Sequence, residues 1–347
     1  MKTSTSAFGN LPDGRKVNLY QFETPKGLKV SITNYGAGIT SIEMPDKQGN
    51  VDEITAGFPT LEGYLGDHPC FGVIVGRFAN RIAGGKFRIN NVEYHLNQND
   101  GENHLHGGPG GFQFRLWDSK LIENENAAGI ELTYHSADLE EGFPGNVKAI
   151  VTYMISNDNE ITITYQASTD QPTHVNLTNH TYFNLTGFRE KIYGHQLMVF
   201  SDLYLEMDAS NIPTGKLLPC KGSHLDFCAE KPLDGPVKSI SSGLDHCFVL
   251  NQARNMELPI ARLSEPGSGR SITVYTDQPG IQVYSGNSLD GSQKGHNGTV
   301  YDKHSAICLE TQHYPDSPNQ PGFPSTLLKP GEKYDYQARL AFNVDKG

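Results

Sequence analysis

The stretch VKAIVTYMISNDNEITITYQ, residues 147–166, decides the fold class. Apolar side chains occupy every second position from Val147 to Ile155 and again from Ile161 to Tyr165. Because successive side chains of a strand point to opposite faces, this period of two predicts strands and not helices. The same alternation recurs in shorter runs at 28–32, 272–274 and 281–283.

The rest of the chain supports an all-β protein with very little helix. Its 37 glycines and 20 prolines separate the alternating runs, and sustained helical spacing of apolar residues is scarce. This pattern predicts a large antiparallel β-sandwich or barrel. A chain of 347 residues can bury a large core in one oversized domain or in two ordinary ones. The loop-rich residues 211–236 are not expected to be a linker, because strand patterns resume on both sides, so we expect one domain over residues 1–347.

Composition excludes several classes of partner. A formal net charge of −11 argues against a nucleic-acid binder, which needs basic side chains to neutralise phosphates. No apolar run is long enough to span a membrane, and the first residues contain no apolar signal segment. Five scattered cysteines without a C-x-x-C pair predict free thiols in a cytoplasmic protein. We expect no cofactor and no metal, because neither a nucleotide motif nor metal-ligand spacing stands out.

The stretch LETQ, residues 309–312, contains the first catalytic candidate. It is expected to end a strand that places Leu309 on a core face and Glu310 on the opposite face. A carboxylate beside partly apolar neighbours is a candidate general base, because loss of hydration raises its pKa towards neutral pH. The alternative is an ordinary solvated glutamate on a half-exposed strand.

The stretch HVNLTNHTYFNL, residues 174–185, supplies a possible partner. Interpreted as one strand, it has a polar face that includes Asn176, His180 and Tyr182, and a mostly apolar face. Amides, hydroxyls and an aromatic ring on one face are typical of a carbohydrate site. A solvent-facing strand is the alternative, although such a strand more often carries Lys and Glu.

Two further stretches carry basic side chains. In GRFANRI, residues 76–82, Arg81 follows Asn80, and its guanidinium can present several donors to hydroxyl or carboxylate oxygens. A structural ion pair is the alternative. His106 precedes two glycines, which fix its imidazole at the edge of a loop. With His104 it forms an H-x-H pair, so a metal site is an alternative here as well.

Three more polar residues are candidates. Asp245 begins a strand after a loop, where a simple turn role is the alternative. Gln282 and Tyr284 share the face opposite Ile281 on another short strand. An amide and an aromatic ring on one face again suit a sugar ligand.

Taken together, six motifs resemble the galactose mutarotases, also called aldose 1-epimerases. The resemblance covers essentially the whole chain. In chain order the motifs are GRFANRI at 76–82, LHGG at 105–108, EGFPGN at 141–146, TNHTYFNL at 178–185, LDH at 244–246 and LETQHYPD at 309–316. The LDH segment is the least specific of the six.

The resemblance implies a fold, an activity and residue roles. The implied fold is the mutarotase-like supersandwich, and the implied activity is interconversion of the α and β anomers of hexoses such as galactose and glucose. Glu310 is then the general base, His180 the general acid and His106 a second histidine beside the ring oxygen. The implied substrate-binding residues are Asn80, Arg81, Asp245, Gln282 and Tyr284.

Three other functions remain open at this point. A binding-only sugar sensor could keep Arg81 and Asp245 without acid and base chemistry. An epimerase of phosphorylated hexoses would need more cationic residues around its cleft. A glycoside hydrolase would need two paired carboxylates, for which only Glu310 and Asp245 stand out. The sequence does not indicate the preferred aldose or the oligomeric state.

Overall fold

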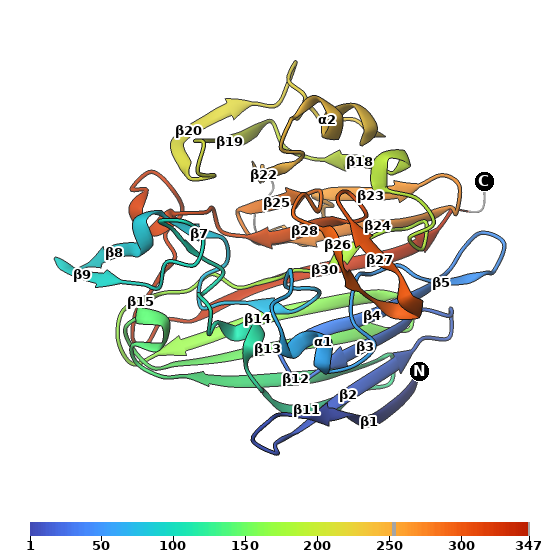
Figure 1. The fold of residues 1–347 in the computed structure, drawn as a ribbon, viewed down its shortest axis with the longest axis horizontal. Coiled ribbons are helices and arrows are strands. Elements are labelled where there is room, and N and C mark those ends of the chain that lie inside the picture. The colour runs from blue at the N-terminus through green and yellow to red at the C-terminus, as the bar shows by residue number, and fades with distance from the viewer. Residues whose placement is uncertain (252–254, 346–347) are drawn as a thin grey trace.

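The computed structural model describes residues 1–251 and 255–345, so residues 252–254 and the last two residues of the expected 1–347 domain lie outside it. In the described chain, three large sheets dominate, and all their strand pairs are antiparallel (Figure 1). The only α-helices in these ranges are α1 (Glu62–Leu65) and α2 (Asp234–Ser239). The predicted all-β fold is confirmed, and none of the described helices is long and apolar enough to cross a membrane.

The largest sheet has nine strands and contains residues 147–166. Residues 147–166 fold into a hairpin in which Val151 pairs with Tyr165. Both of these side chains are buried. In spatial order the strands are β11 (Asp118–Glu123), β12 (Ala127–Ser136), β13 (Val147–Ser156), β14 (Glu160–Thr169), β30 (Tyr334–Val344), β24 (Arg270–Thr276), β23 (Ala261–Glu265), β18 (Gln196–Val199) and β21 (Lys231–Pro232).

A six-stranded sheet carries several of the candidate residues. Its strands, in spatial order, are β17 (Tyr182–Phe183), β28 (Ile307–Gln312), β25 (Gly280–Tyr284), β22 (Asp245–Val249), β19 (Leu203–Met207) and β20 (Pro213–Pro219). A five-stranded sheet formed by the N-terminal residues comprises β1 (Lys2–Asn10), β2 (Lys16–Glu23), β3 (Lys29–Thr33), β4 (Gly38–Pro45) and β5 (Val51–Glu53).

Short two-stranded ladders form separate small sheets beside the three large ones. The pairs are β6 (Ile74–Val75) with β16 (Thr178–Asn179), β7 (Arg81–Ile82) with β10 (His104–Leu105), β8 (Lys86–Ile89) with β9 (Val92–His95), β15 (Thr173–His174) with β29 (Leu327–Leu328), and β26 (Asp290–Lys294) with β27 (Val300–Asp302). The β7–β10 ladder joins the GRFANRI and LHGG motifs directly, since Leu105 pairs with Arg81.

One hydrophobic core joins the three sheets. Val30 of β3, Ile163 of β14 and Leu309 of β28 belong to a single buried cluster. Leu309 thus faces the core, as its alternation with Glu310 predicted. Burying such side chains is the main favourable contribution to folding, at about 1.5–3 kcal/mol for each large apolar side chain. The core fixes the position of β28, and with it the direction in which Glu310 points.

The expectation of one strand over residues 174–185 is wrong. The segment is divided among β15, β16 and β17, and each piece pairs with a different strand. Its three asparagines mostly satisfy main-chain groups: Asn176 donates to the carbonyl of Ala79, Asn179 to that of Gly72, and Asn184 to that of Ser305. Much of the polar face therefore holds neighbouring segments together, because buried carbonyls need donors.

Candidate active site

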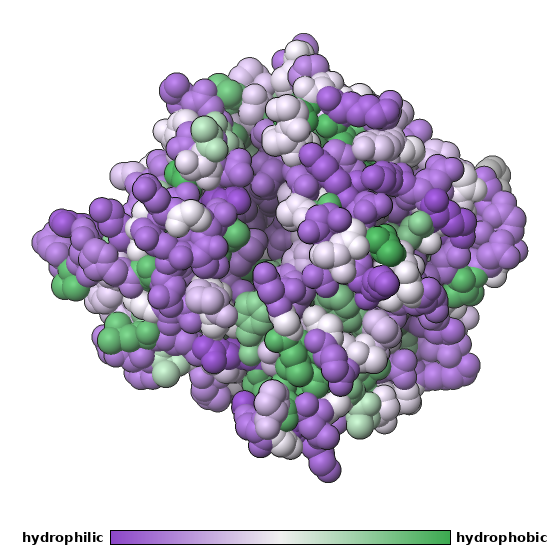
Figure 2. Space-filling view, in the orientation of Figure 1, coloured by the Kyte–Doolittle hydropathy of each residue, from purple (hydrophilic) through white to green (hydrophobic). Residues whose placement is uncertain are grey.

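The eight candidate residues line one cavity of about 960 Å³. Figure 2 shows a hollow on this face, rimmed mainly by hydrophilic residues. Loops that include residues 66–70 and 105–114 form part of its wall, over strands of the six-stranded sheet. The structure thus brings together residues that are up to 230 positions apart, and these are Asn80, Arg81, His106, His180, Asp245, Gln282, Tyr284 and Glu310.

Glu310 and His180 form a buried pair in this cavity. Oε2 of Glu310 lies 3.5 Å from Nε2 of His180, and their side chains are 2% and 6% exposed. Oε2 receives no hydrogen bond from the described chain. The 3.5 Å contact with His180 is too long for a good hydrogen bond and has only the length of an ion pair. The carboxylate can therefore accept a hydrogen bond from a ligand hydroxyl.

Burial shifts the two pKa values in opposite directions. Loss of hydration raises the pKa of Glu310 well above its ordinary value, and the nearby Asp245 carboxylate raises it further. Loss of hydration also lowers the pKa of His180 to about 4. Both shifts have one cause, which is that a buried site disfavours charge. The pair is therefore expected to titrate as a unit that holds one proton near neutral pH.

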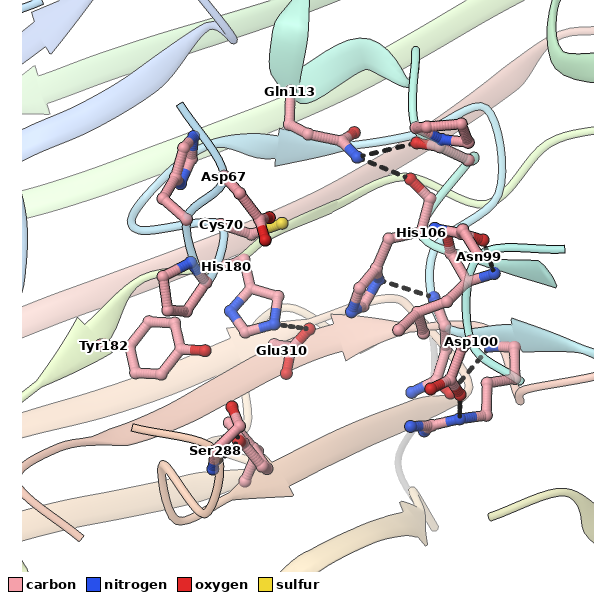
Figure 3. Close-up of a pocket in the computed structure, with 18 of the residues that line it drawn as sticks. Asp67, Cys70, Asn99, Asp100, His106, Gln113, His180, Tyr182, Ser288 and Glu310 are labelled. Carbon is pink, nitrogen blue, oxygen red and sulfur yellow. Dashed lines mark hydrogen bonds and ion pairs between the residues drawn. The ribbon is translucent and has the colours of Figure 1, made fainter. Parts of the chain in front are cut away.

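His106 faces the same pair and is held in one tautomer. The main-chain N–H of Asn80 donates to Nδ1 of His106 at 3.2 Å, so the proton of the neutral ring lies on Nε2. Burial, together with the neighbouring His180 and Arg81, keeps the pKa of His106 well below its ordinary value. The His106 and His180 rings are 5.2 Å apart, and they flank Glu310 in Figure 3. His106 is therefore suited to donate a hydrogen bond without carrying charge.

Arg81 is held by carboxylates on one wall of the cavity. Its Nε donates to Asp100 at 2.7 Å, and a guanidinium nitrogen lies 4.0 Å from Asp245. Gln282 donates to the other oxygen of Asp245 at 2.6 Å. Burial raises the pKa of Asp245, while Arg81 opposes that shift. This row of fixed donors and acceptors can recognise a set of hydroxyl groups.

Asn80 and Tyr284 also line the cavity, although other contacts use part of their polar groups. The side-chain oxygen of Asn80 accepts the main-chain N–H of Arg81. The hydroxyl of Tyr284 lies 2.7 Å from the hydroxyl of Ser288 and accepts that residue's main-chain N–H. The ring of Tyr284 packs near His180, with 6.4 Å between ring centroids. Tyr284 therefore contributes an aromatic wall.

Several residues that line the cavity are not marked by any sequence motif. Asp67 points into it in Figure 3, and Cys70, Asp100 and Gln113 also line it. With Asp67 and Asp100, four carboxylates line the cavity in the described part of the chain, so the expectation that only Glu310 and Asp245 were available was incomplete. Asp100 could have been suspected from its position just before the LHGG motif. No pattern marked the loop of residues 66–70.

The two arginines of GRFANRI have different positions. Arg77 is buried and donates to the carbonyls of Phe143, Pro144 and Gly145. It therefore orders the EGFPGN loop and does not line the cavity. Arg81 is the only lysine or arginine among the described residues that line it.

One cluster could hold a metal ion by distance alone. Ligand atoms of His180, Cys308 and Glu310 all lie within 4.8 Å of one another. However, His180 directs Nδ1 towards Cys308 and Nε2 towards Glu310, whereas an imidazole binds one ion through one nitrogen. The arrangement suits a row of hydrogen-bonding groups better than a shared ion. His104 and His106 form no metal-ligand cluster in the described ranges.

Known proteins resemble this chain over nearly its whole length. Residues 18–341 match the family described as aldose 1-epimerase. The chain belongs to the aldose 1-epimerase family. A galactose mutarotase from Sus scrofa is 43% identical, and the alignment covers 99% of each chain. An aldose 1-epimerase from Escherichia coli K12 is 35% identical, covering 95% of this chain and 96% of that protein.

A solved structure confirms the fold expected for a member of the aldose 1-epimerase family. The galactose 1-epimerase from Lactobacillus acidophilus superposes with a TM-score of 0.86 and 27% identity, covering 99% of both chains. The mutarotase-like sandwich predicted from the six motifs is thus confirmed. The resemblance itself is confirmed by the family match and by the full-length relatives.

Proposed function

We propose that this member of the aldose 1-epimerase family interconverts the α and β anomers of neutral hexoses such as galactose and glucose. The observation that carries the proposal is the buried Glu310–His180 pair, with pKa values shifted in opposite directions in one cavity. The names of the relatives support the same reaction. A phosphorylated sugar is disfavoured, because Arg81 is the only lysine or arginine among the described lining residues and it already contacts Asp100.

Two proton transfers suffice for the reaction. Glu310 takes the proton of the C1 hydroxyl while Nε2 of protonated His180 gives its proton to the ring oxygen. The bond between C1 and the ring oxygen breaks, C1=O forms, and the sugar opens to the free aldehyde. After rotation about the C1–C2 bond, the two groups reverse their roles and close the ring on the other face of the carbonyl. The sugar and the enzyme are then both restored.

The singly protonated pair suits this cycle. In the sugar-free site burial favours the proton on Glu310 and a neutral His180. For ring opening this proton moves to His180 and leaves Glu310 ionised; after opening, Glu310 again holds a proton and His180 is neutral. Both states contain the same number of protons, so no exchange with solvent is needed within a turnover. Burial favours the uncharged arrangement that exists after opening. Proton transfer to a positioned side chain typically contributes about 10²- to 10⁴-fold to rate.

We assign the remaining candidates to sugar binding. Arg81, Asp245 and Gln282 form one row, joined by the Arg81–Asp245 ion pair and the Gln282–Asp245 hydrogen bond, and would hold adjacent hydroxyls. Nε2–H of His106 would donate to an oxygen near the ring, and Asn80 positions that imidazole. Holding the sugar in one orientation brings C1 to Glu310 and the ring oxygen to His180. No cofactor is required by this scheme.

Polarimetry tests the proposed function directly. We expect catalytic amounts of the protein to speed the change in optical rotation of freshly dissolved α-galactose and α-glucose, at a pH where spontaneous mutarotation is slow. The ratio of the two kcat/KM values then gives the preferred aldose. A rate equal to that of buffer alone for both sugars, with the protein folded, would contradict the proposal and favour a binding-only role.

Arg77 and Arg81, the two arginines of GRFANRI, allow a matched test of the sugar-binding assignment. For Arg81→Met we expect KM to rise about 10- to 100-fold, because a hydrogen bond to a charged group contributes about 1.5–3 kcal/mol. Steady-state polarimetry would measure this change. For Arg77→Met we expect the free energy of unfolding to fall by about 3 kcal/mol or more, because the buried carbonyls of residues 143–145 lose their donor.

Each arginine variant is the control for the other. Arg77→Met should keep a near-normal KM at temperatures where it remains folded, and Arg81→Met should keep near-normal unfolding in denaturant. A normal KM in Arg81→Met would remove Arg81 from the sugar-binding set.

We further propose that residues 1–347 act as one domain in the cytoplasm. The hydrophobic cluster shared by the three sheets supports a single domain. The five free cysteines support a cytoplasmic location, where thiols stay reduced.

A further inference from the structure

Cys308 lies next to Nδ1 of His180, the imidazole nitrogen that does not contact Glu310. Its Sγ is 3.5 Å from Nδ1 of His180, and the Cys308 side chain is fully buried. Cys308 and Glu310 are two residues apart on β28, so both point to the same face of the strand. One strand therefore places a partner at each nitrogen of the imidazole.

The neighbouring strand fixes this arrangement. Tyr182 of β17 pairs with Cys308 of β28 in the sheet register. The Tyr182 ring stacks on the imidazole of His180, with 5.0 Å between centroids and 19° between planes. Stacking restricts rotation of the imidazole, so Nδ1 stays at the sulfur while Nε2 stays at Glu310. The contact thus follows from the packing of two paired strands.

We propose that Cys308 is a positioning residue for His180: its sulfur accepts the Nδ1–H hydrogen bond and leaves Nε2 as the only nitrogen that exchanges a proton with the sugar. The inference rests on the proposed function, because it assumes that His180 is the acid. The partner of one imidazole nitrogen sets which nitrogen carries the proton. Burial keeps the thiol neutral by raising its pKa well above its ordinary value.

The proton balance explains why Nδ1 needs a partner. When protonated His180 gives the Nε2 proton to the ring oxygen, the remaining proton must stay on Nδ1. The lone pair on Nε2 can then take the proton back when the ring closes. In the other tautomer Nε2 carries the proton, and the imidazole cannot accept one from the sugar. A partner at Nδ1 therefore keeps the neutral ring ready for the second half of the cycle.

Sulfur also suits the acidity that His180 needs. A carboxylate at Nδ1 would stabilise the charged imidazolium strongly and make it a weaker acid. A neutral thiol is only a weak acceptor, so it orients the ring with little stabilisation of the charge. Titratable groups from several elements face this imidazole, and they are Glu310 and Cys308 of β28, Tyr182 of β17, Tyr284 of β25, and His68 and His106 from loops.

Nitrogen NMR of ¹⁵N-histidine-labelled protein tests the inference apart from activity. We assign the His180 resonances by their loss in His180→Asn and record them at neutral pH without sugar. The wild type is expected to have Nδ1 protonated and Nε2 unprotonated. Cys308→Ala should give a mixture of both tautomers, and Cys308→Ser should restore the single tautomer through its hydroxyl oxygen. An unprotonated Nδ1 in the wild type would overturn the inference.

Kinetics of the same variants provides the second readout. We expect Cys308→Ala to lower kcat about 10- to 100-fold, as loss of the partner of a functional histidine typically does, with KM nearly unchanged. Cys308→Ser should recover most of kcat. Cys220→Ala is the matched control, because Cys220 is a fully buried thiol outside the cavity and its removal should leave the His180 resonances and kcat unchanged. Equal kcat in Cys308→Ala and wild type would also overturn the inference.

The two readouts separate this inference from the proposed function. If the wild type fails to anomerise any aldose, the proposed function fails, while the tautomer of His180 still reports on Cys308. If the wild type is active and the tautomer is insensitive to Cys308→Ala, only the role of Cys308 fails.

Discussion

Glutamine in place of Glu310 is expected to lower kcat about 10²- to 10⁴-fold, because an amide cannot take the proton of the C1 hydroxyl. KM should change by much less, since the amide oxygen can still accept a hydrogen bond and the Arg81–Asp245–Gln282 row is untouched. Polarimetry at several sugar concentrations separates the two constants. This pattern, a loss in kcat with binding retained, is the signature of a group that acts in the transition state.

Protein stability provides the control for Glu310→Gln. The folded-state pKa of Glu310 is raised well above 4.5 by burial, so the folded protein binds more protons than the unfolded chain once the pH exceeds that value. Stability is therefore lost as the pH rises above the unfolded pKa, and the neutral amide removes this cost. Thermal unfolding of Glu310→Gln at neutral pH should occur at the same temperature as in the wild type or higher. The difference should vanish as the pH falls below 4.5.

A different outcome would reassign the base. Turnover at the wild-type rate in Glu310→Gln would point to another carboxylate of the cavity, with Asp245 and Asp67 as the candidates. Loss of activity together with early unfolding would instead mean that Glu310 is needed for the fold, which its unpaired Oε2 argues against.

Three of the site residues predicted from the sequence lie on regular strands. Glu310, Gln282 and Asp245 occupy three adjacent strands, and pairing places Gln282 opposite Glu310 on β28. Period-two alternation was enough to predict which side of their strands Glu310 and Gln282 occupy, whereas Asp245 was predicted only at the start of a strand. The motifs then indicated that the three strands belong to one site, which alternation alone could not do.

The remaining parts depend on contacts between distant segments. Asp67 lines the cavity because its loop packs over the site, and nothing in the local sequence marks that position. Asn176 has an amide side chain of the kind that binds sugar hydroxyls, yet it donates to a main-chain carbonyl instead. Local polarity does not reveal whether a buried amide satisfies the backbone or a ligand. The division of residues 174–185 into three strands could not be predicted from local sequence either, because each strand pairs with a different, distant strand.

Asparagine in place of His180 is expected to lower kcat by about the same 10²- to 10⁴-fold, because the amide cannot protonate the ring oxygen. The side chain is buried between Tyr182 and Glu310, so a smaller polar group should alter KM only modestly. The variant His106→Asn is expected to change KM and kcat in a different proportion. His106 is held as a neutral donor by Asn80, so its loss should raise KM more than it lowers kcat. Polarimetry of both variants under the same conditions makes the comparison.

The double variant Glu310→Gln/His180→Asn decides whether the two residues act in one step. If they transfer protons together during ring opening, removing the second group after the first should cost little more, because the concerted step is already lost. The double variant should then have a kcat close to that of the slower single variant. Losses that multiply would mean that the two residues act independently. If His180→Asn raises only KM while His106→Asn removes kcat, the acid is His106, and the 3.5 Å contact between Glu310 and His180 serves to position the base.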